Sequence, residues 1–211
     1  MILLKCIPMD YQSCLEMQRD LNARRERGEI RDTIIATEHP DVYTGGIHFK
    51  GDYGKYGVPI VKVERGGNLT YHGPGQLVLY FIINLKERGM NVRDLIIRVQ
   101  SALISTLREY GVKGEGRLFE KTGIWVGERK VCSIGFAVKG STTLHGIAMN
   151  INTDLTKFYA ISPCDLDPGV MTSVSNETGR KVDEEEFLEK AIRHLSFEFG
   201  ESIVAKGCGE A

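Results

Sequence analysis

Apolar residues repeat along this chain at two spacings, and the wider spacing predicts three helices. Steps of three and four place the apolar residues of 92–107 on one face, after Asn91 and before Gly111. Asparagine is a good helix N-cap and glycine commonly follows the last turn, so both ends of this segment are marked. Similar segments begin after Asp10 and after Asp183. We therefore expect a helix at each of the three places.

Strands are predicted where β-branched and apolar residues run together without helical spacing. These runs are 2–7, 33–38, 60–64, 77–84, 123–126, 130–138 and 144–151. Strands outnumber helices, so we expect an α+β fold, a mixed β-sheet flanked by helices that cover it on one side. The Gly- and Tyr-rich segment 39–59 is predicted to be a long loop that forms either a mobile lid or the entrance of a binding site. The tail after Gly200 is predicted to be frayed.

Length and charge narrow the class of protein. A chain of 211 residues can bury one core, so we expect a single domain over 1–211. Because 27 Lys and Arg balance 28 Asp and Glu, no global field attracts nucleic acid or an anionic membrane. The N-terminus fits neither a signal peptide nor a membrane span, and no later apolar run is long enough to be one. We expect a soluble, cytoplasmic protein with neither nucleic acid nor membrane as partner.

The cysteines include the first candidate for a catalytic residue. The chain has 5, with no metal-ligand spacing, which argues against a disulfide framework and against a zinc site. Cys6, Cys14 and Cys132 lie in predicted strands or helices, where a cysteine is usually a small buried hydrophobe, and Cys208 lies in the tail. Cys164 stands between prolines in ISPCDLDPG, which indicates a shaped loop that presents its thiol. Cys164 is therefore the candidate nucleophile.

The loop ERGGNLTYHGPGQ (64–76) lies between two predicted strands and is unusually rich in glycine. Glycine allows the main chain to approach a ligand closely, so the loop can present backbone N–H groups at one spot. The side chains of Arg65, Tyr71, His72 and Gln76 would meet the ligand there. From its residues alone, the loop is either such a binding loop or a tight turn stiffened by proline.

Four motifs in order carry a resemblance to a known family. Together with KTGIWVGERKVCSIG (121–135), LHGIAMNIN (144–152) and ISPCDL (161–166), the loop closely resembles the lipoyl(octanoyl) transferases, also called lipoate-protein ligase B. The resemblance implies the catalytic-domain fold of biotin and lipoate protein ligases. The chain departs from the family pattern at YTGGIHF and STTLHG, which leaves the range of substrates open.

The resemblance implies roles for two residues. Cys164 is the cysteine that takes the acyl group, and Lys130 forms a Cys–Lys dyad with it. A free thiol has a pKa of about 8.5, and a nearby cation lowers it. Without the family, a solvated hairpin lysine is the favoured interpretation of Lys130, because lysines are mostly exposed. His72 and His145 are each either a general base or a structural hydrogen-bond partner, and we name Gln76 and His145 as supporting residues.

The resemblance also implies which residues contact the acyl substrate. They are Arg65, Gly66, Gly67, Asn68, Leu69, Thr70, Tyr71 and His72 in the first motif, Ser133, Ile134 and Gly135 in the second, and Gly146, Ile147 and Ala148 in the third. Many of these residues are small, so they leave room for an aliphatic tail. Burial of an octanoyl tail at ~0.8 kcal/mol per methylene yields about 5 kcal/mol, enough to prefer it over acetyl.

The function implied is that of an octanoyltransferase of lipoate biosynthesis. Its donor is octanoyl-acyl carrier protein, its intermediate a cysteine thioester, and its acceptor a lysine of the lipoyl domains of 2-oxoacid dehydrogenases or of the glycine cleavage H protein. The reaction uses no cofactor and no metal. An acidic carrier protein would meet a local basic patch, for which we name Arg65, Lys50 and Lys55.

Two other classes of protein are alternatives. An ATP-dependent lipoate- or biotin-protein ligase shares the fold, but it adenylates a free acid and needs no acylated cysteine. A lipoyl-domain binding module without catalysis would lack the dyad. Walker A, GxSxG and HExxH motifs are absent from the sequence, so hydrolase and ATPase interpretations lose support.

Overall fold

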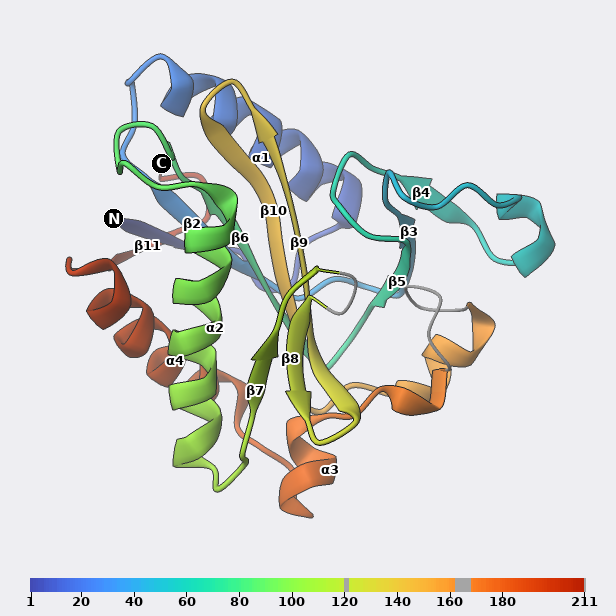
Figure 1. The fold of residues 1–211 in the computed structure, drawn as a ribbon. Helices are drawn as coiled ribbons and strands as arrows, with labels where there is room; N and C mark the ends of the chain where they lie inside the picture. The colour runs from blue at the N-terminus through green and yellow to red at the C-terminus, as the bar shows by residue number, and fades with distance from the viewer. Residues whose placement is uncertain (120–121, 162–167, 211) are drawn as a thin grey trace.

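A computed structural model describes residues 1–119, 122–161 and 168–210, and within them the central feature is an eight-stranded mixed sheet (Figure 1). Its strand order is β11-β1-β2-β6-β10-β9-β8-β7, and a smaller sheet has the order β4-β3-β5. The strands are β1 (Ile2–Lys5), β2 (Thr33–Thr37), β3 (Val42–Gly45), β4 (Ile60–Lys62), β5 (Leu69–His72), β6 (Gln76–Ile82), β7 (Glu115–Arg117), β8 (Gly123–Val126), β9 (Arg129–Lys139), β10 (Thr142–Asn150) and β11 (Val204–Gly207).

Three helices begin where the sequence predicts, after Asp10, Asn91 and Asp183, whereas the short helix at Val174–Thr178 was not predicted. The helices are α1 (Tyr11–Glu26), α2 (Val92–Glu109), α3 (Val174–Thr178) and α4 (Glu184–Phe199), with short 3-10 helices at Tyr53–Tyr56, Leu155–Ala160 and Pro168–Val170. Asp10 and Asp183 each accept a hydrogen bond from a backbone N–H three residues on, while Asn91 and Asp94 form a reciprocal capping box. Gly111, with φ of 76°, follows α2 as expected. Within the described ranges, no helix has the length and apolar character needed to cross a membrane.

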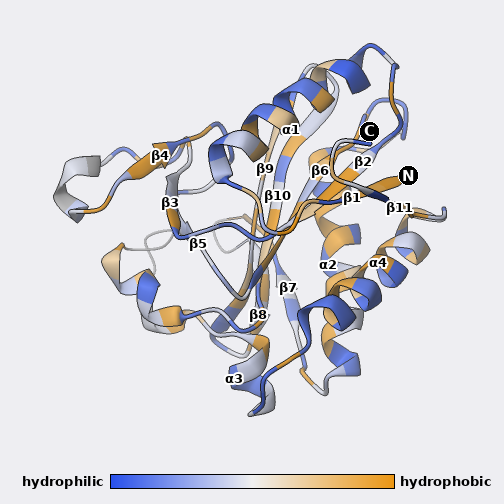
Figure 2. Cartoon of the chain, turned by 180° about the vertical axis from the view of Figure 1, so that it is seen from behind, coloured by the Kyte–Doolittle hydropathy of each residue, from blue (hydrophilic) through white to orange (hydrophobic). Residues whose placement is uncertain are grey.

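The helices cover both faces of the large sheet, whereas the sequence predicted helices on one face only. Every residue of β6 is buried, so its two faces both need cover. Leu79 and Phe81 join the apolar cluster beneath α2 and α4, and Val78 and Tyr80 join the one beneath α1. Figures 1 and 2, seen from opposite sides, show α1 on one face and α2 with α4 on the other. The mixed sheet with flanking helices is confirmed, and its one-sided cover was wrong.

The segment 39–59 is more ordered than the predicted loop. It contains β3, which pairs in parallel with β4 and antiparallel with β5. These ladders satisfy backbone groups that a loop would leave to water. The smaller sheet stands beside the large one (Figure 1), and its strand β5 is part of the Gly-rich segment 64–76, which was predicted to be a loop throughout.

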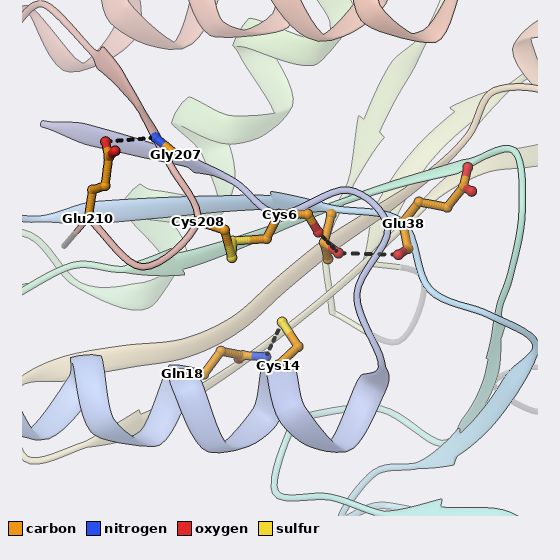
Figure 3. Close-up of a disulfide and its surroundings, with 8 residues drawn as sticks. Cys6, Cys14, Gln18, Glu38, Gly207, Cys208 and Glu210 are labelled. Carbon is orange, nitrogen blue, oxygen red and sulfur yellow. Dashed lines mark hydrogen bonds between the residues drawn. A yellow bond between two sulfur atoms is a disulfide. The ribbon is translucent and has the colours of Figure 1, made fainter.

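The C-terminal tail is paired instead of frayed. β11 lies parallel to β1, with Ile2 opposite Val204. A disulfide joins Cys6 to Cys208, with their Cα atoms 5.0 Å apart (Figure 3). The expectation that the cysteines would form no disulfide was therefore wrong for this pair. The two residues are 202 positions apart, so no local pattern marks them as partners.

Candidate active site

A cavity of about 950 Å³ lies where β9 extends beyond its pairing with β8. Its size is at the upper end of what small-molecule sites usually offer. Its walls come from α1, the Gly-rich loop, β5, β6, β9, β10 and the start of α2. Of the residues named from the sequence, it brings together Lys130, Arg65, Gly66, Gly67, Asn68, Thr70, His72, Ser133, Ile134, Gly135, His145, Gly146, Ile147 and Ala148.

Leu69 and Tyr71 are buried elsewhere. They alternate along β5 with Thr70 and His72, and successive side chains of a strand point to opposite faces. Thr70 and His72 therefore line the cavity, while Leu69 and Tyr71 pack in a separate apolar cluster with Phe158. The Tyr71 hydroxyl also donates to Asp41 at 2.7 Å. Both residues support the strand from behind.

The Gly-rich loop is attached to the free edge of β9. The pairing of β8 with β9 reaches only to Ser133, which leaves the next residues of β9 without that neighbour. Gly66 uses the free edge by donating its backbone N–H to the carbonyl of Phe136 at 3.1 Å. A Cβ on Gly135 would lie 3.0 Å from the carbonyl oxygen of Gly66. This approach of main chain to main chain is tight for any residue larger than glycine.

Arg65 shapes the loop from inside. Its side chain is buried, and its guanidinium donates to the carbonyl and hydroxyl oxygens of Thr44 and to the carbonyl of Gly66. A guanidinium used in this way is not available on the surface, so its proposed part in a basic docking patch was wrong. Lys50, named for the same patch, is exposed.

Lys130 is buried at the cavity, with 3% of its surface exposed. Its ammonium lies 5.7 Å from the centre of the Trp125 ring, and its backbone forms a bridge with Met171. The Thr172 N–H donates to the Lys130 carbonyl at 2.9 Å. The alternative of a solvated hairpin lysine is therefore wrong. Cys164 lies in 162–167, outside the described residues, so its place relative to Lys130 stays a prediction.

The free cysteines among the described residues, Cys14 and Cys132, are poor nucleophiles. Burial raises the pKa of each thiol to about 12, and the charge of Lys130 only partly offsets this at Cys132. Both therefore stay protonated near pH 7. In the same part of the chain, His, Cys, Asp and Glu side chains do not gather in a group of three that could hold a metal ion.

His72 is a neutral imidazole within the cavity wall. Its Nδ1 is 2.8 Å from Oε1 of Gln76, and its ring stacks on Tyr11 with centroids 5.8 Å apart. Burial lowers the pKa of His72 to about 3. Such a weak base cannot take a proton efficiently from an ammonium group at pH 7. Of the roles left open, the structure favours a hydrogen-bond partner for His72 over a general base.

His145 occupies an unusual backbone conformation. Its φ is 62°, in the left-handed region, although it lies within β10. It is buried, and neither ring nitrogen has a hydrogen-bond partner in the part of the chain that the structure describes; Nε2 lies 3.7 Å from Oε2 of Glu64. Burial lowers the pKa of His145 as well. A neutral imidazole held in this way offers one donor and one acceptor to a cavity ligand.

Several residues of the site were missed by the sequence analysis. Tyr11, Val92 and Ile96 line the cavity, but their apolar spacing is that of ordinary core positions. Asn150 stands in the LHGIAMNIN motif without a role. Its amide donates to the carbonyl of Thr172 at 3.0 Å and accepts from a buried side-chain amide at 2.9 Å. A buried asparagine at the end of an apolar strand was the signal that could have revealed it.

Solved structures share this fold. A lipoate-protein ligase A bound with ATP matches with a TM-score of 0.77 and 16% identity, covering 99% of this chain and 89% of that one. The biotin protein ligase from Aquifex aeolicus in complex with biotin and ATP matches with a TM-score of 0.57 and 16% identity, covering 94% and 70%. At such identities the likeness concerns the fold alone.

Proteins of similar sequence show the family to which the chain belongs. The family model of the lipoyl protein ligase A/B catalytic domain matches residues 10–196. A Picrophilus torridus protein named "Probable octanoyltransferase 2" is 47% identical over 91% of this chain and 76% of its own length. The "Octanoyltransferase" of Syntrophobacter fumaroxidans is 38% identical over 89% and 85%. The chain therefore belongs to the lipoyl protein ligase A/B catalytic domain family, among the octanoyltransferases of that family.

Proposed function

We propose that this octanoyltransferase works through an acyl-enzyme on Cys164. The Cys164 thiolate attacks the thioester of octanoyl-acyl carrier protein, the C–S bond to the carrier breaks so that its sulfur leaves as a thiolate, and a new thioester forms on the enzyme. The amine of an acceptor lysine then attacks that thioester, and an amide forms as the C–S bond breaks. The proton lost by nitrogen returns to the departing Cys164 thiolate.

The burial of Lys130 at the cavity is the observation that carries this proposal. A cation near a thiol favours the thiolate, and two unit charges about 4 Å apart interact by roughly 4 kcal/mol at an effective dielectric near 20. Met171, which follows Cys164 along the chain, forms a backbone bridge with Lys130. The described residues that follow the segment 162–167, which contains Cys164, are thus attached to β9, the strand that carries Lys130.

The lining of the cavity suits an aliphatic tail. Gly135, Gly146 and Ala148 leave space, while Ile134 and Ile147 supply apolar surface. Burial at ~0.8 kcal/mol per methylene favours an octanoyl over an acetyl group by about 5 kcal/mol. The cavity is also large enough to admit, besides the octanoyl tail, part of the arm by which the acyl carrier protein holds the octanoyl group.

We further propose lipoyl domains as acceptors, those of 2-oxoacid dehydrogenases and the glycine cleavage H protein, in the cytoplasm. A structural neighbour is a Thermoplasma acidophilum bi-partite lipoate protein ligase studied with its E2 lipoyl domain, with a TM-score of 0.70. The second candidate function is that of an ATP-dependent ligase, since a lipoate-protein ligase A bound with ATP shares the fold. The octanoyltransferase relatives, at much higher identity, favour the transferase.

Intact-mass measurement separates the two functions. The protein is mixed with octanoyl-acyl carrier protein without ATP, and in parallel with octanoate, ATP and magnesium. The proposal predicts one octanoyl adduct, mapped to Cys164, only in the first mixture, and its loss in Cys164→Ser. Adding a lipoyl domain should remove the adduct and give a modified lysine. ATP-dependent modification that survives in Cys164→Ser would instead identify a ligase.

A further inference from the structure

A chain of buried hydrogen bonds leads from the backbone beside Lys130 to the cavity. Asn150 donates its amide N–H to the carbonyl of Thr172 at 3.0 Å. Its own side-chain oxygen accepts from Nε2 of Gln76 at 2.9 Å, and that nitrogen also donates to the carbonyl of Tyr71 at 3.2 Å. The remaining atom of the Gln76 amide, Oε1, faces Nδ1 of His72 at 2.8 Å.

This chain admits only one assignment of protons. Backbone carbonyls accept hydrogen bonds and never donate them, so the carbonyl of Thr172 requires the nitrogen of the Asn150 amide. The Asn150 oxygen then requires the nitrogen of Gln76, which leaves the Gln76 oxygen as an acceptor. The ring nitrogen that faces this oxygen must therefore carry the proton of His72.

The second ring nitrogen of His72 is left as an acceptor. His72 lines the cavity with Nδ1 turned to Gln76, and Nε2 has no hydrogen-bond partner among the described residues. Burial, together with His39, Arg65 and His145, holds the ring in its neutral form. His39 differs, because its two nitrogens are both within hydrogen-bond distance of protein oxygens.

We propose that Gln76 and Asn150 are positioning residues that hold His72 in the Nδ1–H tautomer, so that its Nε2 lone pair accepts a hydrogen bond from the amine that attacks the acyl group. This inference rests on the proposed function, since the amine is that of the acceptor lysine. An amine attacks through its lone pair, so an acceptor that binds one of its N–H groups turns that lone pair toward the thioester carbon. Nitrogen bonds to carbon, the C–S bond breaks, and the proton leaves nitrogen for the Cys164 thiolate.

Gln76 and Asn150 both belong to the sequence motifs, and each has a role here as a positioning residue. Gln76 closes the Gly-rich loop, and Asn150 closes the LHGIAMN run. Both are buried and neither lines the cavity. Both amides instead act through His72.

The tautomer is tested directly by long-range ¹H–¹⁵N spectra of protein labelled in its 5 histidines, with His72 assigned by its loss in His72→Gln. The wild type should show His72 with a protonated Nδ1 and a bare Nε2 from pH 5 to pH 8. In Gln76→Leu and in Asn150→Leu the two tautomers should become mixed. Asn22→Leu is the matched control, because Asn22 is a buried amide that binds the backbone of the same strand β10, at the carbonyls of Thr142 and Thr143. That control should leave the His72 signals in place.

Single-turnover kinetics test the consequence. In Gln76→Leu the acylation of Cys164 should proceed as in Asn22→Leu, while transfer to the acceptor lysine should slow by about tenfold to a hundredfold. Gln76→Glu keeps an acceptor at Nδ1 but adds a carboxylate, which raises the pKa of His72. Transfer by Gln76→Glu should therefore fall at acidic pH with a new ionisation and recover in part above it, since the variant lacks the N–H donor to Asn150 and Tyr71. The double variant Gln76→Glu/His72→Gln keeps the carboxyl group without the imidazole, so an ionisation that disappears in it belongs to His72.

Two outcomes would overturn the inference. One is a wild-type His72 that carries its proton on Nε2. The other is a Gln76→Leu protein that transfers the acyl group as fast as Asn22→Leu. If no acyl-enzyme formed in the wild type, the proposed function would fail, whereas the tautomer measurement would still report on the hydrogen-bond chain.

Discussion

Gly66 is joined to Phe136 by a hydrogen bond of 3.1 Å from its backbone N–H to the Phe136 carbonyl. This bond attaches a loop of the smaller sheet to an open strand edge of the larger one. It forms because β8 separates from β9 beyond Ser133. The cavity lies at this junction, so its shape depends on close contacts between main chains.

A methyl group added at Gly146, in the cavity wall, should destabilise the pairing of β10 with β6. A Cβ there would lie 2.0 Å from the carbonyl oxygen of Leu79, which belongs to the neighbouring strand and must shift. We expect Gly146→Ala to lower the free energy of unfolding by about 1–3 kcal/mol. Gly66→Ala is the control, because the nearest atom to its added Cβ is 3.6 Å away. Equal thermal midpoints for the two variants would contradict this account.

Removal of the Lys130 charge should make the reactive thiol less acidic. We expect Lys130→Ala to slow alkylation of Cys164 at pH 7 and to shift the alkylation profile to higher pH, because a lost cation disfavours the thiolate. Cys14 and Cys132 should contribute little, since burial raises the pKa of each to about 12. Lys139→Ala, an exposed change on the same strand, should leave the profile unchanged. An unchanged profile in Lys130→Ala would remove the lysine from the mechanism.

The parts of the fold that the sequence predicts are those with local causes. The cap at Asn91 and the stop at Gly111 act within one turn of the helix, so their residues suffice to locate it. The pairing of Ile2 with Val204 depends instead on the whole chain being folded. The same holds for Cys6 and Cys208, which have no local relation in the sequence.

The site was predicted as a set of motifs, and the structure divides the first of them by face. Thr70 and His72 line the cavity while Leu69 and Tyr71 support it, a division that strand alternation explains once 69–72 is known to be a strand. The left-handed backbone of His145 was not predicted, because a residue other than glycine adopts positive φ only uncommonly.

Loss of the Cys6–Cys208 disulfide should lower stability without changing catalysis. The crosslink joins residues 202 positions apart, and its loss enlarges the entropy of the unfolded chain. We expect Cys208→Ser to lower the free energy of unfolding by about 2–4 kcal/mol in urea, with an unchanged rate of octanoyl transfer, since neither cysteine lines the cavity. Added reductant should lower the wild type to the level of the variant and leave the variant unaffected. A lower transfer rate in the folded variant would indicate a role for the disulfide in the site.

The depressed pKa of His72 should make the protein sensitive to acid. The pKa is about 3 in the folded protein against an ordinary value of 6.5, so between these values the unfolded chain binds the extra proton. Stability should therefore be complete above about pH 6.5 and decrease as the pH falls, by up to about 1.4 kcal/mol per pH unit for this one group. Urea unfolding at pH 7 and pH 5 measures the loss, to which His39 and His145 contribute in the same direction.

The share of His72 is isolated by His72→Gln, which cannot take up a proton. Its loss of stability between pH 7 and pH 5 should be smaller than that of the wild type by up to about 2 kcal/mol, the product of the slope and the interval below pH 6.5. His194→Gln is the control, because that histidine lies on α4 outside the cavity and contacts Glu109. Because His194→Gln keeps the buried imidazole of His72, it should lose more stability between pH 7 and pH 5 than His72→Gln does. If His72→Gln lost as much stability as the wild type, His72 would not be held neutral by burial, and the acceptor role of its Nε2 would lose its basis.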